Sequence, residues 1–129
     1  MQYLLVTVTI IRHLCGSGNI GARARDVLDA GPTTPHTFHV SVISLMEIVY
    51  LSEKNRIKIN LSRTLERLDA SSLYSIVDLT PEIIKKAESI KFYELHDRMI
   101  IATALWLDVP ILSSDSRFDD VKGLSVIWS

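Results

Sequence analysis

Three acidic residues, Glu47, Asp97 and Asp115, are the side chains of this sequence best placed for chemistry. Glu47 comes one helical turn after the second predicted strand, and Asp115 directly follows the fourth. Asp97 begins an apolar helix that leads into the fourth strand. Parallel strands end at one edge of a sheet, where ligands bind, so the three side chains are expected to converge there.

Three carboxylates at one edge would repel one another unless a divalent cation neutralised them. All-oxygen ligands suit Mg²⁺ or Mn²⁺, and the sequence has no Cys/His set for zinc. Such a metal activates water and neutralises charge on a phosphodiester during in-line attack. The residues alone therefore predict a metal-dependent phosphodiesterase.

Each acidic residue also has a purely structural interpretation. Ser44-x-x-Glu47 fits a capping box, in which the glutamate bonds to the first N–H of its helix. Asp97 at a helix start is stabilised by the helix dipole without any further role. Asp115 lies between serines, where most aspartates belong to turns. The coincidence of all three at one sheet edge favours the functional interpretation.

The chain alternates extended apolar runs with amphipathic stretches, a pattern typical of α/β proteins. Strands are predicted over residues 3–8, 37–42, 75–79, 110–113 and 124–128. Helices are predicted over residues 20–30, 44–56, 62–70 and 97–107, with another starting at Thr80-Pro81-Glu82. Strands separated by helices pair in parallel, so we expect a three-layer sandwich around a mainly parallel sheet of four to five strands, as a single domain spanning 1–129.

Composition limits the classes of function. The 129 residues are 47% hydrophobic and 22% charged, which suits a globular domain and excludes a disordered linker, collagen and a coiled-coil rod. The 14 basic and 15 acidic residues give a formal charge of −1, which excludes the broad basic field of a non-specific DNA-coating protein. A local basic patch stays compatible with that balance.

Cysteine usage and hydropathy predict the compartment. The single cysteine, Cys15, excludes an internal disulfide and a multi-thiolate zinc site, as expected in a reducing cytoplasm, and we expect it to be a small buried residue. No apolar run approaches the roughly 20 residues that cross a bilayer, and the first residues lack a signal-peptide pattern. We therefore expect a soluble, cytoplasmic protein that does not bind membranes.

Three segments in order carry a family resemblance. Residues 40–47, 96–104 and 111–118 read VSVISLME, HDRMIIATA and ILSSDSRF. They resemble the successive acidic motifs of PIN-domain ribonucleases, most closely the VapC-type toxins of toxin–antitoxin pairs. The resemblance implies a small parallel-sheet nuclease fold, Mg²⁺ or Mn²⁺, an RNA substrate cut within single strands, a homodimer and a cognate antitoxin.

The resemblance also implies roles for individual residues. Glu47, Asp97 and Asp115 match the second, third and fourth acids of the family's metal site. Ser113 matches the hydroxyl residue two positions before the last acid. Thr7 matches the hydroxyl residue that follows the first acid.

The first acid of the family pattern is missing. The family has Leu-Asp-Thr at the end of its first strand, whereas this chain has Leu5-Val6-Thr7. An isopropyl group cannot bind a cation, so with Val6 the chain lacks the carboxylate that is the family's principal metal ligand. We expect the chain to bind the metal weakly and to hydrolyse RNA poorly or not at all. The alternative is a catalytically dead PIN fold that only binds RNA or an antitoxin.

Basic residues beside the acids are further candidates. Arg98 and Arg117 could hold phosphate oxygens, since guanidinium groups suit bidentate phosphate contact. Ion pairs with the neighbouring acids are the alternative, which we favour for Arg98. We expect His96 to be a turn residue rather than a catalytic base.

A glycine-rich segment and a helical region complete the candidates. Residues 16–21 match the dinucleotide-binding pattern G-x-G-x-x-G, but no strand directly precedes them and no ribose-binding acid follows at the expected distance. We expect a loop between two helices. If an antitoxin binds, we expect an exposed apolar groove near the helices of residues 45–68.

Overall fold

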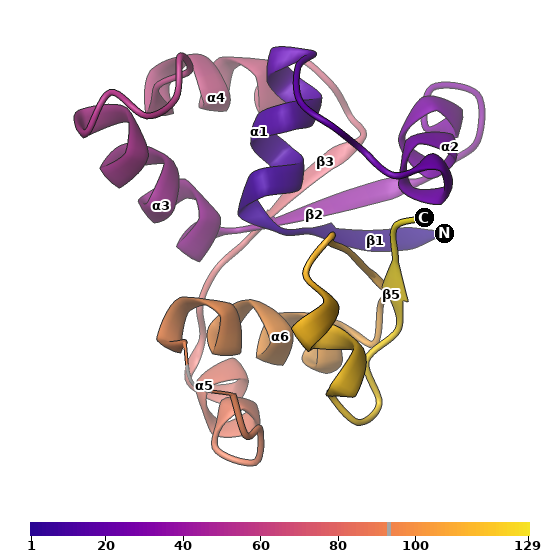
Figure 1. The fold of residues 1–129 in the computed structure, drawn as a ribbon, viewed down its shortest axis with the longest axis vertical. Helices are drawn as coiled ribbons and strands as arrows, with labels where there is room; N and C mark the ends of the chain where they lie inside the picture. The colour runs from indigo at the N-terminus through magenta and orange to yellow at the C-terminus, as the bar shows by residue number, and fades with distance from the viewer. Residues whose placement is uncertain (93) are drawn as a thin grey trace.

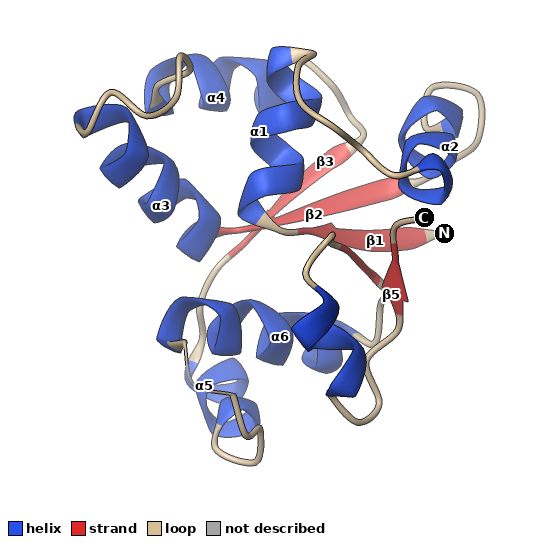
Figure 2. Ribbon diagram, viewed as in Figure 1, coloured by secondary structure: helices blue, strands red, loops and turns tan. Residues whose placement is uncertain are grey.

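The computed structural model describes residues 1–92 and 94–129. Within this part, five parallel strands form one sheet with the spatial order β3-β2-β1-β4-β5. The strands are β1 (Gln2–Leu5), β2 (Thr37–Ser41), β3 (Tyr74–Val77), β4 (Ile111–Leu112) and β5 (Val126–Ile127). Figures 1 and 2 show the sheet between two groups of helices. The prediction of a layered α/β sandwich around a parallel sheet is therefore confirmed.

Helices of the described residues connect the strands. They are α1 (Thr7–Cys15), α2 (Ala22–Ala30), α3 (Val42–Glu53), α4 (Leu61–Asp69), α5 (Pro81–Ala87), α6 (Leu95–Leu107) and the 3-10 helix η1 (Ser116–Asp120). Helices α1 to α4 lie on one side of the sheet, and α5, α6 and η1 lie on the other (Figure 1). Each connection between parallel strands thus crosses one face of the sheet.

Alternate residues of β1, together with Val6, which follows it, point into two separate cores. Tyr3 and Leu5 belong to the core shared with α1 to α4, whereas Leu4 and Val6 belong to the core shared with α5 and α6. All four side chains expose 8% or less of their surface. The central strand is therefore buried on both faces, as expected in a parallel sheet covered by helices.

The first strand is shorter than predicted. The β-branched run at residues 3–8 predicts one strand, but β1 ends at Leu5 and α1 begins at Thr7. The hydroxyl of Thr9 donates to the carbonyl oxygen of Leu112 at the end of β4 (2.9 Å), which fixes α1 against the sheet. Packing of the helix here overrides the strand preference of Val and Thr. Thr7 consequently lies in the first turn of a helix.

The other elements lie within a few residues of their predicted bounds. Helix α3 begins at Val42, two residues before its predicted start, because Ser41 caps it by accepting the N–H of Ile43 (3.1 Å). Helix α6 begins at Leu95, two residues before Asp97. Strands β4 and β5 are each only two residues long.

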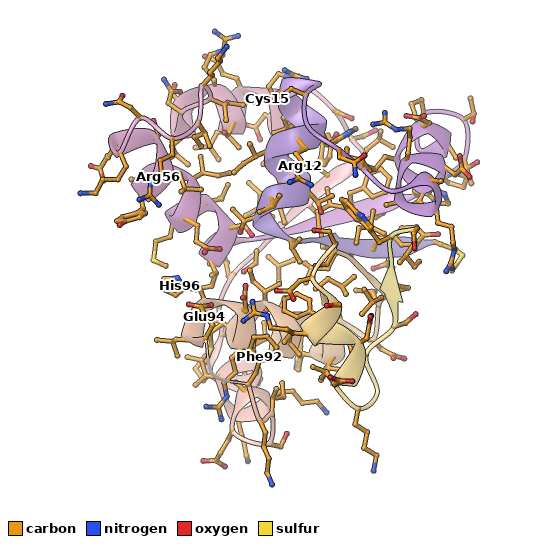
Figure 3. The ribbon with its side chains drawn as sticks, in the orientation of Figure 1. Arg12, Cys15, Arg56, Phe92, Glu94 and His96 are labelled. Carbon is orange, nitrogen blue, oxygen red and sulfur yellow. The ribbon has the colours of Figure 1, made fainter. Side chains whose placement is uncertain are left out.

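The prediction that Cys15 is buried is wrong. Cys15 is exposed and is the last residue of α1. Gly16 follows in a left-handed conformation (φ 64°) and ends the helix. Figure 3 shows Cys15 at the outer end of α1.

No helix in residues 1–92 and 94–129 is long and apolar enough to cross a membrane. The longest of them, α6, has 13 residues. A helix of that length spans about 20 Å, whereas the hydrocarbon core of a bilayer is about 30 Å thick.

Two histidines, His13 on α1 and His39 on β2, are shielded from solvent to different degrees. Nε2 of the half-buried His13 lies 2.8 Å from Oη of Tyr74, and Nε2 of the buried His39 lies 2.7 Å from Oε1 of Gln2. Burial lowers the pKa of both side chains below the ordinary value. The folded protein therefore favours their neutral forms.

This preference predicts a pH dependence of stability. Because the unfolded chain binds protons at a histidine pKa of about 6.5, stability from the neutral histidines is fully present above that pH and is lost as the pH falls through and below it. We expect His13→Gln and His39→Gln to flatten the fall in the free energy of unfolding between about pH 7 and pH 5. Urea titrations at each pH measure the free energy of unfolding. If it falls as steeply with decreasing pH in the variants as in the unchanged protein, the prediction is wrong.

Candidate active site

Glu47, Asp97 and Asp115 line one cavity of about 420 Å³ at the carboxyl edge of the sheet. The three side chains expose 26%, 25% and 29% of their surface. Figure 1 shows the N-terminal ends of α1 and α3 side by side where β1 and β2 end. The wall of the cavity consists of Val6, Thr7, Val8, Glu47, Leu51, Asp97, Ser113, Ser114, Asp115, Arg117 and Phe118. The topology thus brings the three acids together from distant parts of the sequence.

A hydroxyl group of α1 holds Glu47. Oγ1 of Thr7 donates to Oε1 of Glu47 (2.6 Å) and lies 2.9 Å from Oγ of Ser44. Thr7 and Ser44 are both buried. The capping-box interpretation of Ser44 and Glu47 is wrong, because α3 begins at Val42 and its cap is Ser41. Instead, Thr7 of the neighbouring helix α1 holds the Glu47 carboxylate.

Asp97 lies in the first turn of α6. Its N–H donates to Oε2 of Glu94 (2.6 Å), the N-cap of the helix. The pKa of the Asp97 carboxyl is raised to about 6, chiefly by burial and then by the charges of Glu94 and Glu47. Asp115 adds to this rise and Arg117 opposes it. The acids of the cavity therefore act on one another electrostatically, which a helix-dipole role for Asp97 alone would not produce.

Arg117 neutralises Asp115 and reaches toward Asp97. Its Nε lies 3.0 and 3.2 Å from the two carboxylate oxygens of Asp115, and its Nη2 donates to Oδ2 at 2.6 Å. The same Nη2 lies 3.6 Å from Oδ2 of Asp97. The side-chain hydrogen bond from Arg117 lowers the pKa of Asp115 below its ordinary value. Asp115 also caps η1 by accepting the backbone N–H of Arg117 (3.0 Å), so it is a turn residue and a cavity residue at once.

Arg98 lies outside the cavity wall. Its Nε and Nη2 donate to the carbonyl oxygens of Ala87 and Glu88 at the end of α5 (2.8 and 3.4 Å). The ion pair with a neighbouring acid that we favoured for Arg98 is therefore wrong. His96 lies in the first turn of α6 rather than in a turn between elements, with Nδ1 3.7 Å from Oε2 of Glu47.

Glu94 is a residue that the sequence analysis missed. Its Oε1 lies 3.8 Å from Nδ1 of His96, and its charge raises the pKa of Asp97. Figure 3 shows Glu94 and His96 together at the N-terminal end of α6. Glu94 precedes Asp97 by three residues, which is the spacing between an N-cap side chain and the N–H that it accepts. Glutamate is not among the preferred N-caps, so the sequence signal for this cap is weak.

The glycine-rich segment 16–21 is a loop between α1 and α2, as expected. A Cβ on Gly21 would collide with the carbonyl oxygen of Trp128, and a Cβ on Gly18 would lie 2.8 Å from Cγ of Arg12. These close contacts at Gly18 and Gly21, and the left-handed conformation of Gly16, account for the glycines without a dinucleotide.

The fold and the shared cavity agree with a known family. The family model described as PIN domain matches residues 3–124. The chain belongs to the PIN domain family. A search of curated protein sequences gives no match.

Solved structures of similar fold include complexes named VapBC and FitAcB. VapBC2 from Rickettsia felis, bound to a promoter DNA fragment, matches with a TM-score of 0.74 and 16% identity over 100% of both chains. DNA-bound VapBC from Salmonella typhimurium has a TM-score of 0.71 and 18% identity, over 98% of this chain and 97% of that one. FitAcB from Neisseria gonorrhoeae has a TM-score of 0.66 and 20% identity, over 97% and 96%. The resemblance stated from the motifs is thus confirmed at the level of the fold.

The motif resemblance assigns Val6 to the position of the family's first acid. Val6 lines the cavity and packs with the core on the α6 side. Its side chain has no oxygen, so it offers no ligand. Ser113 is buried, and its Oγ accepts the N–H of Asp115 (3.1 Å), which fixes the backbone of that acid.

PIN domains generally use a divalent metal, but the residues present here do not fit one as they stand. Within residues 1–92 and 94–129, no three His, Cys, Asp or Glu side chains are grouped closely enough to hold an ion. Val6 contributes no ligand, and the guanidinium of Arg117 engages both carboxylate oxygens of Asp115. A dication at Asp115 would compete with Arg117 for this carboxylate.

The electrostatic coupling of the cavity predicts opposite effects of two substitutions on the pKa of Asp97. Glu47→Gln removes a negative charge and should lower that pKa from about 6, whereas Arg117→Gln removes the opposing positive charge and should raise it. Carbon NMR of the Asp97 carboxyl during a pH titration in metal-free buffer measures both. Glu53→Gln, at the far end of α3, is the matched control and should leave it unchanged. Two unchanged values at Glu47 and Arg117 would show that these charges do not interact.

Proposed function

We propose that this chain is a toxin-type PIN-domain endoribonuclease, VapC-like and dependent on Mg²⁺ or Mn²⁺, whose activity is lost or strongly weakened because Val6 replaces the first acid. The observation that carries the proposal is the single cavity shared by Glu47, Asp97 and Asp115 in a chain of this family. RNA is the substrate class that the resemblance implies. A single domain over 1–129, a homodimer and a cytoplasmic location remain predictions.

The described contacts give each cavity residue a role in this proposal. Thr7 holds the carboxylate of Glu47, and Ser113 holds the backbone beside Asp115. Arg117 screens Asp115 from Asp97 and is 63% exposed, so it is free to swing out from the acids. A phosphate oxygen would suit its bidentate guanidinium as well as a carboxylate does. We therefore assign the phosphate contact to Arg117 rather than to Arg98.

A second candidate function is a catalytically dead PIN fold that binds RNA or an antitoxin. The observation that favours it is the ion pair of Arg117 with Asp115, which supplies positive charge to the cavity without a metal. The two candidates differ in what one restored acid would do. A disabled enzyme should regain activity, whereas an evolved binder should not.

We also propose an antitoxin as partner, because the solved relatives are complexes of that kind. A groove of about 540 Å³ lies between α1, the α3–α4 connection and α4. Its floor is apolar and its rim is basic; the lining includes Ile11, Leu14, Ile57, Ile59, Arg56, Lys58, Arg63 and Arg67. This groove involves α1 as well as the region of residues 45–68 in which we expected it. An acidic segment with apolar anchors is the complementary partner.

Val6→Asp tests the enzymatic proposal. The new carboxylate adds a hard oxygen ligand to the cavity, so we expect Mn²⁺ binding to tighten by at least about tenfold and cleavage of RNA to become detectable. Isothermal titration with Mn²⁺ and cleavage of a labelled single-stranded RNA measure the two effects.

Val6→Asn is the matched control, since it has the same shape without the charge and should gain neither property. Asp115→Asn in the Val6→Asp background should abolish the gain. If Val6→Asp gains neither metal affinity nor cleavage while remaining folded, the enzymatic proposal fails and the dead binding module is favoured.

Charge reversal at the groove rim tests the antitoxin proposal. Arg63→Glu together with Arg67→Glu places like charges against an acidic partner, so affinity for the cognate antitoxin should fall at least about tenfold in a surface-binding assay. Lys54→Glu with Lys85→Glu changes the net charge equally outside the groove and should leave affinity within about threefold. Equal losses for both pairs would place the antitoxin elsewhere.

A further inference from the structure

A larger groove lies beside the active-site cavity on the α6 side of the sheet. It has a volume of about 690 Å³ and lies between the end of α5, the C-terminal half of α6 and the segment after η1. Arg117 lines both this groove and the cavity that holds the three acids. A ligand lying in the groove would therefore reach the acids past Arg117.

The groove is locally basic in a chain whose net charge is −1. Lys86, Lys91 and Lys122 line it and are exposed. None of the three lysines forms an ion pair with a residue in the part of the chain that the structure describes. With Arg117 they outnumber the acidic lining residues, Asp108 and Asp120. The groove thus offers unpaired positive charge to a polyanion.

An aromatic ring lies where this groove meets the cavity. Phe92 is partly buried, and its ring packs edge-to-face on the buried Phe118 with 5.3 Å between centroids. The guanidinium carbon of Arg117 lies 5.3 Å from the centroid of the Phe92 ring. Figure 3 shows Phe92 on the same side of the molecule as Glu94. A ring that packs on Phe118 and has a guanidinium over it is the kind of platform on which unpaired bases stack, on the ring or on the guanidinium plane.

We propose that this groove binds the single-stranded RNA segment that leads into the active-site cavity, with phosphates on Lys86, Lys91 and Lys122 and one base on Phe92. The inference rests on the proposed function and extends it to residues outside the acidic cavity. Spaced lysines combined with a ring suit a single strand, because unpaired bases expose their faces and a duplex does not. An acidic protein segment would satisfy the lysines but would make no specific use of the ring.

The test is binding of a fluorescent single-stranded RNA of about 12 nucleotides to the full chain, measured by anisotropy without divalent metal. Lys86→Glu/Lys91→Glu/Lys122→Glu should weaken binding by at least about tenfold and make the slope of log affinity against log salt shallower by about 2, since each lost phosphate contact removes about 0.7. Arg25→Glu/Lys54→Glu/Lys85→Glu is the matched control, with the same change in net charge at exposed residues outside this groove, and should change affinity less than about threefold.

The stacking role has its own pair of variants. Phe92→Leu keeps an apolar side chain but removes the ring, and should weaken RNA binding by about fivefold or more, as loss of one base–aromatic stack does. Phe92→Tyr keeps the ring and should bind as the unchanged protein does. Thermal unfolding of each variant checks that the fold is retained.

Two results would overturn the groove assignment. The first is equal weakening by the groove lysines and the control lysines. The second is a labelled polyglutamate of equal charge that binds as tightly as the RNA and is insensitive to Phe92→Leu, which would assign the groove to an acidic protein segment.

Cleavage separates this proposal from the previous one: if Val6→Asp is inactive but RNA binding still depends on the groove lysines, only the enzymatic proposal fails. If Val6→Asp cleaves RNA and the groove variants change neither binding nor cleavage, only the groove proposal fails.

Discussion

Mutual repulsion of three carboxylates is the constraint on which this site depends. The parallel sheet brings Glu47, Asp97 and Asp115 to one edge, where their charges raise one another's free energy. Two of them are compensated: Thr7 donates to Glu47, and Arg117 pairs with Asp115. The pKa of Asp97 is raised chiefly by burial, and the charges of Glu94 and Glu47 raise it further. The balance of charge in the cavity therefore rests on Arg117, which also lines the neighbouring basic groove.

The order of elements could be predicted from the sequence, because apolar runs and cap residues are local signals. Thr80-Pro81-Glu82 begins α5 as predicted, with the Thr80 hydroxyl accepting from Ile83. The boundary at Thr7 could not be predicted, since the β-branched run there favours a strand. What decides it is a contact between Thr9 and the Leu112 carbonyl oxygen, more than a hundred residues away in the sequence. Local preference yields to packing at that point.

The same distinction holds within the site. The spacing of the acids relative to the strands placed all three at the correct edge, because that placement follows from topology. Their partners could not be read from spacing: Ser44 and Glu47 look like a capping box, yet Glu47 is bound by a hydroxyl 40 residues earlier. Arg98 follows Asp97 directly, but consecutive residues of a helix point about 100° apart, so its guanidinium reaches α5 instead. Arg117 pairs with Asp115 two residues earlier, because Asp115 is the N-cap of the 3-10 helix η1 and its side chain accepts the backbone N–H of Arg117.

Val6 combines a structural gain with the functional loss that we propose. It occupies the N-cap of α1 but makes no side-chain cap hydrogen bond, and the first turn of that helix has no acidic residue. An aspartate at an N-cap would bond to free N–H groups and be favoured by the helix dipole, which offsets repulsion from neighbouring acids. The valine instead buries its methyl groups in the α6-side core with 8% exposure, where a carboxylate would pay for desolvation. A helix end thus makes this position tolerable for the charge of an acid, and on the proposed function a valine here keeps the packing intact while removing a metal ligand.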